Sequence, residues 1–158
     1  MADRKVTVKN MSSATVSINI PNLNFTRELK GENTKTNIPF DTMYEGLSDP
    51  GIMVLFDEGF LYIEDKQDRI DLGLEFEDES EPQSAKVMDS KLILEILERN
   101  EPMEIRTTLE NLALEQRKKF AQVAIQNKIY NPGLAKFIMD YTGIDLLEAI
   151  QQFKELED

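Results

Sequence analysis

The front half of the chain alternates apolar and polar residues with a period of two, which is the pattern of strands with one buried face. Val6 and Val8 alternate with charged or hydroxylated neighbours, and the alternation resumes, after a turn-rich break at residues 10–13, as far as Ile20. Pro21 ends the second run, because proline has no N–H to donate to a sheet ladder. The pattern predicts two strands joined by a hairpin-like turn.

Two more strands are predicted before residue 41. One spans Leu23–Leu29, with its apolar residues on one face, and a Gly-Glu-Asn turn follows it. The other spans Thr36–Phe40, where Pro39 favours an edge position or a strand end. Together with the first two, these strands predict a small, mostly antiparallel sheet or sandwich.

The stretch from residue 38 to residue 65 mixes strand and helix signals. Asp41 is a predicted N-cap for a short helix over Thr42–Leu47. The apolar run Ile52–Phe56 fits either a buried strand or a short helix, and the preceding Asp-Pro pair favours the helix. Leu61–Ile63 returns to strand. This stretch therefore predicts short helices that cover one face of the sheet.

An acidic segment separates the two halves of the chain. Five acidic residues fall between Glu75 and Glu81, and no basic residue occurs from Ile70 to Ala85. Repulsion between like charges and low hydrophobicity predict an extended, mobile linker over residues 74–84. Two interpretations of it remain open: a solvated surface loop, or a docking strip for a basic partner.

The back half changes to a period of 3.6, which predicts a helical bundle. The breaks come at a Glu-Pro pair, at an Asn-Pro-Gly turn and at a Thr-Gly pair, and Asp145 opens the last helix with Glu148 three residues on. A break inside the second helix, near 113–115, is a further option. The first predicted helix has an apolar stripe from Met88 to Leu97 and ends at Arg99-Asn100. The second begins near Thr108 or earlier and stops at Asn131-Pro132-Gly133, and it is followed by Leu134–Tyr141 and by a last helix from Asp145 onward.

These elements predict an α+β fold built from two modules. Residues 1–73 form a β-rich module, a small antiparallel sheet or sandwich with short helices. Residues 74–84 form the acidic linker, and residues 85–158 form the helical module. At 158 residues the chain is long enough for one good core or for two small layers.

Composition excludes several kinds of chemistry. The chain has no cysteine, which excludes disulfides and thiolate catalysis, and no histidine, which excludes imidazole-based triads and metal sites. A net charge of −12 disfavours direct binding to nucleic acid or to anionic membranes. No signal peptide and no membrane-spanning run is visible, so we expect synthesis in the cytoplasm.

A search for catalytic motifs singles out no site. There is no phosphate-binding loop and no Gly-x-Gly-x-x-Gly, and the acid-rich run 65–71 lacks the rhythm of an EF-hand. We therefore predict no catalytic, cofactor-binding or metal-binding residues, no cofactor, no small-molecule substrate and no enzymatic activity. The one basic cluster, Arg117-Lys118-Lys119, is interpreted either as a contact for an acidic partner or as the solvated face of a helix.

Short motifs, mostly at turns and strand ends, fall in two stretches of the chain. They are Val6–Ser12, Ile20–Leu23, Thr26–Glu28, Ile38–Phe40, Leu47, Pro50-Gly51 and Leu61–Ile63 in the first stretch, and Lys136–Ile150 with Tyr141-Thr142-Gly143-Ile144-Asp145 in the second. Together these stretches resemble a family of small, mostly uncharacterised phage proteins from phages of gut and Gram-positive bacteria, usually labelled virion or capsid-associated. The resemblance covers about two thirds of the chain, and the middle, residues 74–108, does not match. Family members often have Pro-Gly-Gly at the late turn, where this chain has Pro-Gly-Ile.

The resemblance implies a structural or assembly protein of a bacteriophage particle. Its partners would be other virion proteins at a capsid, neck or tail position, with self-association as a further option, and its location would be the virion. Open sheet edges can accept a strand from such a partner. The alternative hypothesis is an acidic inhibitor, or nucleic-acid mimic, that acts on a host protein.

Overall fold

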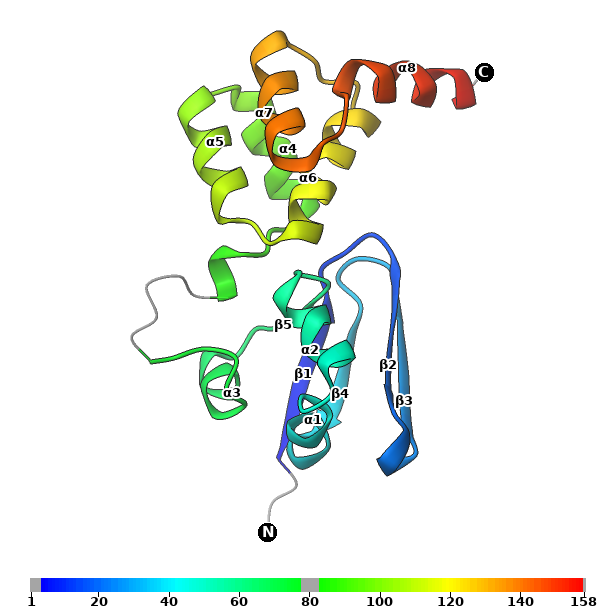
Figure 1. Cartoon of the computed structure of the whole chain (residues 1–158), viewed down its shortest axis with the longest axis vertical. Helices are drawn as coiled ribbons and strands as arrows, with labels where there is room; N and C mark the ends of the chain where they lie inside the picture. Colours follow the sequence, from blue (N-terminus) through cyan, green and yellow to red (C-terminus); the bar gives the residue numbers. More distant parts are fainter. Residues whose placement is uncertain (1–3, 78–82, 158) are drawn as a thin grey trace. The chain divides into compact units, whose positions relative to one another are not determined.

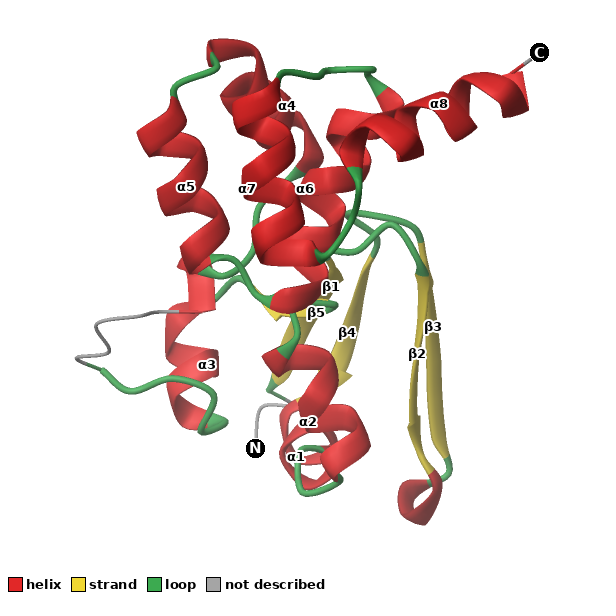
Figure 2. Ribbon diagram, turned by 45° about the horizontal axis from the view of Figure 1, so that its top comes forward, coloured by secondary structure: helices red, strands yellow, loops and turns green. Residues whose placement is uncertain are grey.

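The computed structural model describes residues 4–77 and 83–157, and the chain divides into two compact units, Met1–Val87 and Met88–Asp158. Each unit has a hydrophobic core of its own. The strands lie in the first unit, and the described part of the second unit is helical (Figures 1 and 2). The α+β class predicted from the sequence is confirmed.

A three-stranded antiparallel sheet forms the frame of the first unit. Its central strand β1 (Lys5–Asn10) pairs with β4 (Lys35–Pro39) on one side and with β5 (Leu61–Ile63) on the other. The period of two predicted for β1 is confirmed, because Val6 and Val8 are fully buried. β4 lies at an edge, as its proline predicted.

The second sheet is a two-stranded hairpin of β2 (Thr15–Ile20) and β3 (Phe25–Lys30), closed by the 3₁₀ turn η1 (Pro21–Leu23). The prediction that β3 begins at Leu23 is wrong. Proline fixes a φ that suits the turn, and Asn24 in the left-handed region (φ 50°) then reverses the chain. Leu23 consequently lies at the hairpin tip, where its side chain is 40% exposed.

A buried asparagine fixes the corner between the two sheets. The backbone N–H of Asn10 donates to Thr34 O (2.9 Å), and its side-chain Nδ2 donates to Ala14 O (2.7 Å) and Leu29 O (3.2 Å). Its Oδ1 accepts from both the N–H (2.8 Å) and the hydroxyl (2.9 Å) of Ser12. One side chain thus satisfies four polar groups at the point where the ribbon of strands bends.

Two short helices, α1 (Phe40–Gly46) and α2 (Pro50–Asp57), follow β4 and contribute to the core of the first unit (Figure 1). The helical option for residues 52–56 is the one observed, and the side chain of Asp49 caps α2 by accepting from the N–H of Gly51 (2.8 Å). The prediction of an N-cap at Asp41 is wrong. The chain passes directly from β4 into α1, so Asp41 lies in the first helical turn.

The core of the first unit lies between the inner faces of these elements. The buried face of the three-stranded sheet, the hairpin and the two helices all contribute to one cluster. Its buried members are Val6, Val8, Val16, Ile18, Ile20, Leu29, Ile38, Met43, Ile52, Phe56, Leu61, Ile63 and Leu72.

A third helix, α3 (Lys66–Asp71), was not predicted. Its N-cap is Asp65, whose carboxylate accepts from the N–H of Asp68 (2.9 Å). The acid-rich run 65–71, which lacks the EF-hand pattern, is therefore a short helix with Asp65 as its N-cap. Asp65 and Asp68 have the same spacing of three residues as Asp145 and Glu148, which predicted the last helix of the chain.

The predicted linker over residues 74–84 begins too early. Leu74 packs against the core of the first unit, and the side chain of Glu75 is almost fully buried against Arg69. Attraction to a buried cation outweighs repulsion from the following acids, which the sequence pattern does not reveal. The rest of the acidic run, residues 78–82, lies outside the described residues, and the short turn η2 (Gln83–Ala85) follows.

In the second unit α6 contacts α4, α7 and α8, and α5 packs on α7. Phe120, Ala121 and Ala124 of α6 are fully buried. The option of a break in the predicted second helix is the one observed: the chain leaves helix at Leu112 and Ala113. Residues 102–126 therefore form two helices and not the single helix of the other option. The helices of this unit are α4 (Ser90–Arg99), α5 (Pro102–Asn111), α6 (Leu114–Gln126), α7 (Pro132–Thr142) and α8 (Leu146–Glu157).

Three helix ends of the second unit follow the predicted signals, whereas α6 ends at Gln126, before the predicted stop at residues 131–133. Asn100 and Gly143 end α4 and α7 in the left-handed region. The carboxylate of Asp145 accepts from the N–H of Glu148 (3.1 Å) at the start of α8. Contacts divide the chain between Val87 and Met88, slightly after the expected start of the helical module at residue 85.

Candidate functional site

The polar face of the three-stranded sheet carries the most developed surface feature of the first unit. Lys5, Thr7 and Lys9 project from β1 on the face opposite the core, because alternate side chains of a strand point to opposite faces. Lys35 and Asn37 project beside them from β4, and the hydroxyl of Thr7 donates to Asn37 Oδ1 (2.7 Å). The strand side of this surface is therefore basic.

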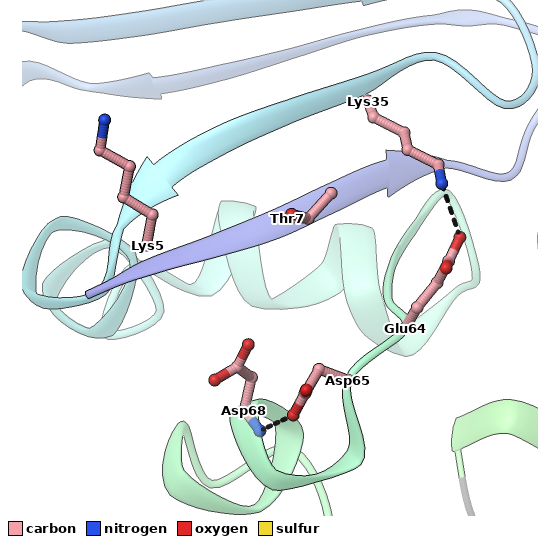
Figure 3. A pocket seen from close by; sticks show the side chains of 6 residues that line it. All are labelled: Lys5, Thr7, Lys35, Glu64, Asp65 and Asp68. Atoms are coloured by element: carbon pink, nitrogen blue, oxygen red, sulfur yellow. Dashed lines mark hydrogen bonds and ion pairs between the residues drawn. The ribbon is translucent and has the colours of Figure 1, made fainter.

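Glu64, directly after β5, lies across this face and holds two strands together. Its carboxylate lies 3.2 Å from Lys9 Nζ and 3.3 Å from Lys35 Nζ. Figure 3 shows the pair with Lys35. The ammonium of Lys9, and then that of Lys35, lowers the pKa of Glu64, and partial burial opposes them. One carboxylate thus pairs with the two lysines nearest to it.

Helix α3 supplies an acidic wall opposite the strands. Its Asp68 and Asp71 accept from the guanidinium of Arg4, at 2.6 and 2.8 Å. The same guanidinium lies over the ring of Phe40, 4.1 Å from its centroid. Hydrogen bonds to Asp68 and then to Asp71 raise the pKa of Arg4. The residue before β1 thus connects the strand to the helix.

A buried arginine fixes the position of this wall. Arg69 of α3 donates through Nη1 to the carbonyls of Ile63 and Glu64 (2.8 Å each) and to the hydroxyl of Tyr62 (3.1 Å). Its Nε lies 3.2 Å from Glu75 Oε1, and the two side chains are 5% and 1% exposed. Burial, aided by nearby carboxylates and opposed by Arg69, raises the pKa of Tyr62. Arg69 therefore fastens α3 to the end of β5.

Between strand and helix lies an open groove of about 530 Å³. Figure 3 shows its strand side, with Lys5 and Thr7, and its helix side, with Asp65 and Asp68. Lys35 and Glu64 complete the lining. The lining side chains are polar or charged, positive on the strands and negative on the helix side, which suits an extended polar chain better than an apolar ligand.

Acid is expected to weaken the first unit through these pairs. Hydrogen bonds from Arg4 and then Gln67 lower the pKa of Asp71, and the pKa of Glu64 is lowered as well. A lowered folded-state pKa contributes stability above the unfolded-state values, about 3.9 and 4.3, and that stability is lost as the pH falls through the folded-state pKa. We expect the melting temperature to fall steadily between about pH 5 and pH 3.

NMR titration of the carboxyl groups of Glu64 and Asp71 measures the two pKa values directly. In the folded protein both midpoints are expected below those of model peptides, and Glu64→Gln is expected to flatten part of the acid slope. Midpoints at the model-peptide values, with an unchanged slope in Glu64→Gln, contradict the prediction.

The predicted basic cluster of Arg117, Lys118 and Lys119 does not form one charged surface. Lys119 is 2% exposed, and Arg117 lies over the ring of Tyr141 and donates to Glu110 O (3.0 Å). Only Lys118 is exposed. The interpretation of the trio as a solvated helix face is therefore wrong, because successive residues of a helix point in different directions and Lys119 is buried. The contact with an acidic partner stays a prediction.

The structure also separates the members of the predicted acidic strip. Glu75 is buried in its pair with Arg69, whereas Glu77 is exposed. The remaining acids of the strip lie outside the described residues. Sequence reasoning missed the groove itself, because Lys5 and Thr7 on its strand side are far along the chain from Asp65 and Asp68 on its helix side, and these residues carry no motif. The acid spacing in residues 65–68 was the one local signal.

Within residues 4–77 and 83–157, no group of three or more acidic side chains is placed to hold a metal ion. No helix in the same described residues has the length and apolarity to cross a membrane. Comparison with protein-family models, with curated proteins and with solved structures finds no match to this chain.

Proposed function

We propose that this chain is a non-catalytic structural or assembly protein of a bacteriophage particle that binds other virion proteins. The phage assignment rests on the resemblance described above. The observation that carries the binding role is that each unit closes a hydrophobic core of its own. Two units with complete cores offer two surfaces, each built without the other, and such a chain is suited to hold two neighbours in an assembly.

The polar groups around the groove support binding over catalysis. The acids that line it are engaged in structural bonds: Glu64 with two lysines, Asp68 with Arg4, and Asp65 with the first turn of α3. A general acid or base needs a carboxyl that is available to exchange its proton with a substrate. Carboxylates fixed by ion pairs instead give a rigid, patterned surface, which favours specific contact with a protein.

The same pairing argues against the alternative of an acidic inhibitor or nucleic-acid mimic. A mimic presents rows of unpaired carboxylates to a basic protein. Here Asp71, Glu104 and Glu110 also pair with arginines of this chain. Internal pairing lowers the negative potential that such a partner would experience.

Mass spectrometry of density-gradient-purified particles tests the proposal, using the phage whose genome carries the gene. The chain is expected to co-sediment with intact particles at a fixed ratio to the major capsid protein. An unrelated cytoplasmic host protein of similar abundance is the control for carry-over. Absence from particles, together with synthesis early in infection, would reject the structural role in favour of the inhibitor.

A further inference from the structure

We infer that the open edge of β1 at residues 5–7 accepts an extended segment of another protein, and that this segment places a carboxylate opposite Lys5. The inference deepens the proposed protein-binding function and rests on it. It adds the site, the mode of binding and the chemistry of the partner segment.

The register of the sheet leaves half of β1 without a second neighbour. β4 pairs with β1 along residues 5–9, but β5 pairs only with Val8, Lys9 and Asn10. Beyond Ile63 the chain leaves the sheet and enters α3. Residues 5–7 of β1 therefore have a strand on one side and the groove on the other.

The direction of the backbone groups follows from the bonds at both ends of β1. Arg4 O accepts from Phe40 N (2.8 Å), and Asn10 N donates to Thr34 O (2.9 Å), so the even-numbered residues face β4. Met11 N donates to Phe60 O (2.8 Å) on the opposite side. Because the groups of a strand alternate, the N–H and C=O of Lys5 and Thr7 point away from β4, toward the groove.

The groove lies where a further strand would lie. Lys5 and Thr7 line it on the strand side, and Asp65 and Asp68 line it across from them (Figure 3). An added strand runs about 4.8 Å from its neighbour, and three residues of it cover about 10 Å. Its main-chain groups can bond to the N–H and C=O groups of Lys5 and Thr7, which β5 does not reach, and this is the mode of β-strand addition.

Charge selects the partner segment. Lys35 in the lining and the nearby Lys9 pair with Glu64, and Arg4, directly before Lys5, pairs with Asp68 and Asp71. Within the part of the chain that the structure describes, Lys5 makes no ion pair and its side chain is exposed. Opposite charges on directly facing residues of neighbouring strands attract, so an Asp or Glu is favoured beside Lys5.

Amide hydrogen exchange of the free protein tests the edge itself. Val6 and Val8 are expected to exchange slowly, and Lys5 and Thr7 quickly, because only the even-numbered N–H groups donate to β4. Slow exchange at Thr7, matching that of Val8, would show that the edge is already bonded and would overturn the inference.

A random peptide display library, selected against the whole chain, tests binding. Clones are expected to contain an acidic residue within a β-branched run. Thr7→Pro removes the edge N–H and leaves the main-chain bonds of Val6 and Val8 to β4 in place, although it also removes the hydroxyl bond to Asn37. It should weaken these clones by roughly tenfold or more. Thr7→Val keeps the N–H and should leave them unchanged. Lys5→Glu should weaken them by about fivefold, because it places like charges face to face.

The variants also decide among other outcomes. NMR spectra must show that Thr7→Pro keeps its fold; if it does not, Lys5→Glu and protection of the Thr7 amide by bound peptide take its place. Clones that bind wild type and Thr7→Pro equally well overturn the inference, as does enrichment of basic clones. A dimer of this chain that Thr7→Pro disperses assigns the edge to a second copy instead. Presence in particles without edge-specific clones removes this inference and leaves the proposed function standing.

Discussion

Replacing Arg69 by alanine is expected to lower the free energy of unfolding of the first unit by about 3–5 kcal/mol. The substitution leaves the carboxylate of Glu75, whose side chain is 1% exposed, without its cation. It also leaves the carbonyls of Ile63 and Glu64 without a donor. The cost arises mainly from a buried, uncompensated charge.

NMR-monitored urea unfolding is the appropriate measurement, because backbone signals report each unit separately and a two-unit chain need not unfold in one step. Signals of the second unit act as an internal control and should keep their midpoint. Arg69→Lys is expected to recover only part of the loss, since one ammonium cannot donate in the directions of a guanidinium. Arg69→Met combined with Glu75→Leu should be far less damaging than Arg69→Ala alone. Equal losses in both would contradict a role for unpaired charge.

Replacing Asn10 by alanine is expected to destabilise the same unit by about 3 kcal/mol. The Asn10 side chain is fully buried and serves Ala14 O, Leu29 O and both donors of Ser12. Alanine leaves several of these groups unsatisfied at a site that water reaches poorly, and each such group costs about 1–3 kcal/mol.

Thermal and urea unfolding of a matched pair measures this effect. Asn37→Ala removes an asparagine of the same sheet whose exposed side chain accepts one bond from Thr7, and it should cost well under about 1 kcal/mol. Asn10→Asp should be at least as damaging as alanine, because a second oxygen then faces the two carbonyls. Equal stability of Asn10→Ala and Asn37→Ala would show that the corner does not depend on this network.

The parts of the fold that sequence predicted well are those with a local physical cause. The alternation in β1 and β2 and the apolar stripes of the helical unit appear as expected, because one buried face imposes its period on the residues. The cap at Asp145 and the stop at Gly143 depend on neighbouring residues only. Local signals of this kind are readable without knowledge of the fold.

The errors have causes that lie elsewhere in the chain. Glu75 is buried because it pairs with Arg69 of α3, and the acidic residues around Glu75 in the sequence do not reveal this pair. Helix α3 itself is short and has no apolar stripe, so its periodicity is weak. The prediction that the basic trio in α6 forms one solvated face was wrong, because it counted charges along the sequence and ignored the direction in which each helical residue points.

The groove was beyond sequence reasoning for a related reason. The groove depends on where β5 ends relative to β1, which is set by the register of the two strands. A strand of three residues has too short a pattern for its register to be predicted from the sequence. Its wall depends on ion pairs between Arg4 and residues more than sixty positions later. The positions of charged residues along the chain do not show which of them pair in space. The expectation of an open sheet edge also did not specify which strand would carry it.

The shortness of the open edge of β1 has a consequence for solubility. Runaway polymerisation into cross-β fibres generally uses segments of about six or seven residues that stack without interruption. Here the exposed stretch ends at β5 on one side and at the bridge from Arg4 to α3 on the other. A lysine also protrudes from it, which natural sheets use as a guard against self-association. The exposed stretch of β1 is therefore too short and too well guarded to seed a fibril by itself.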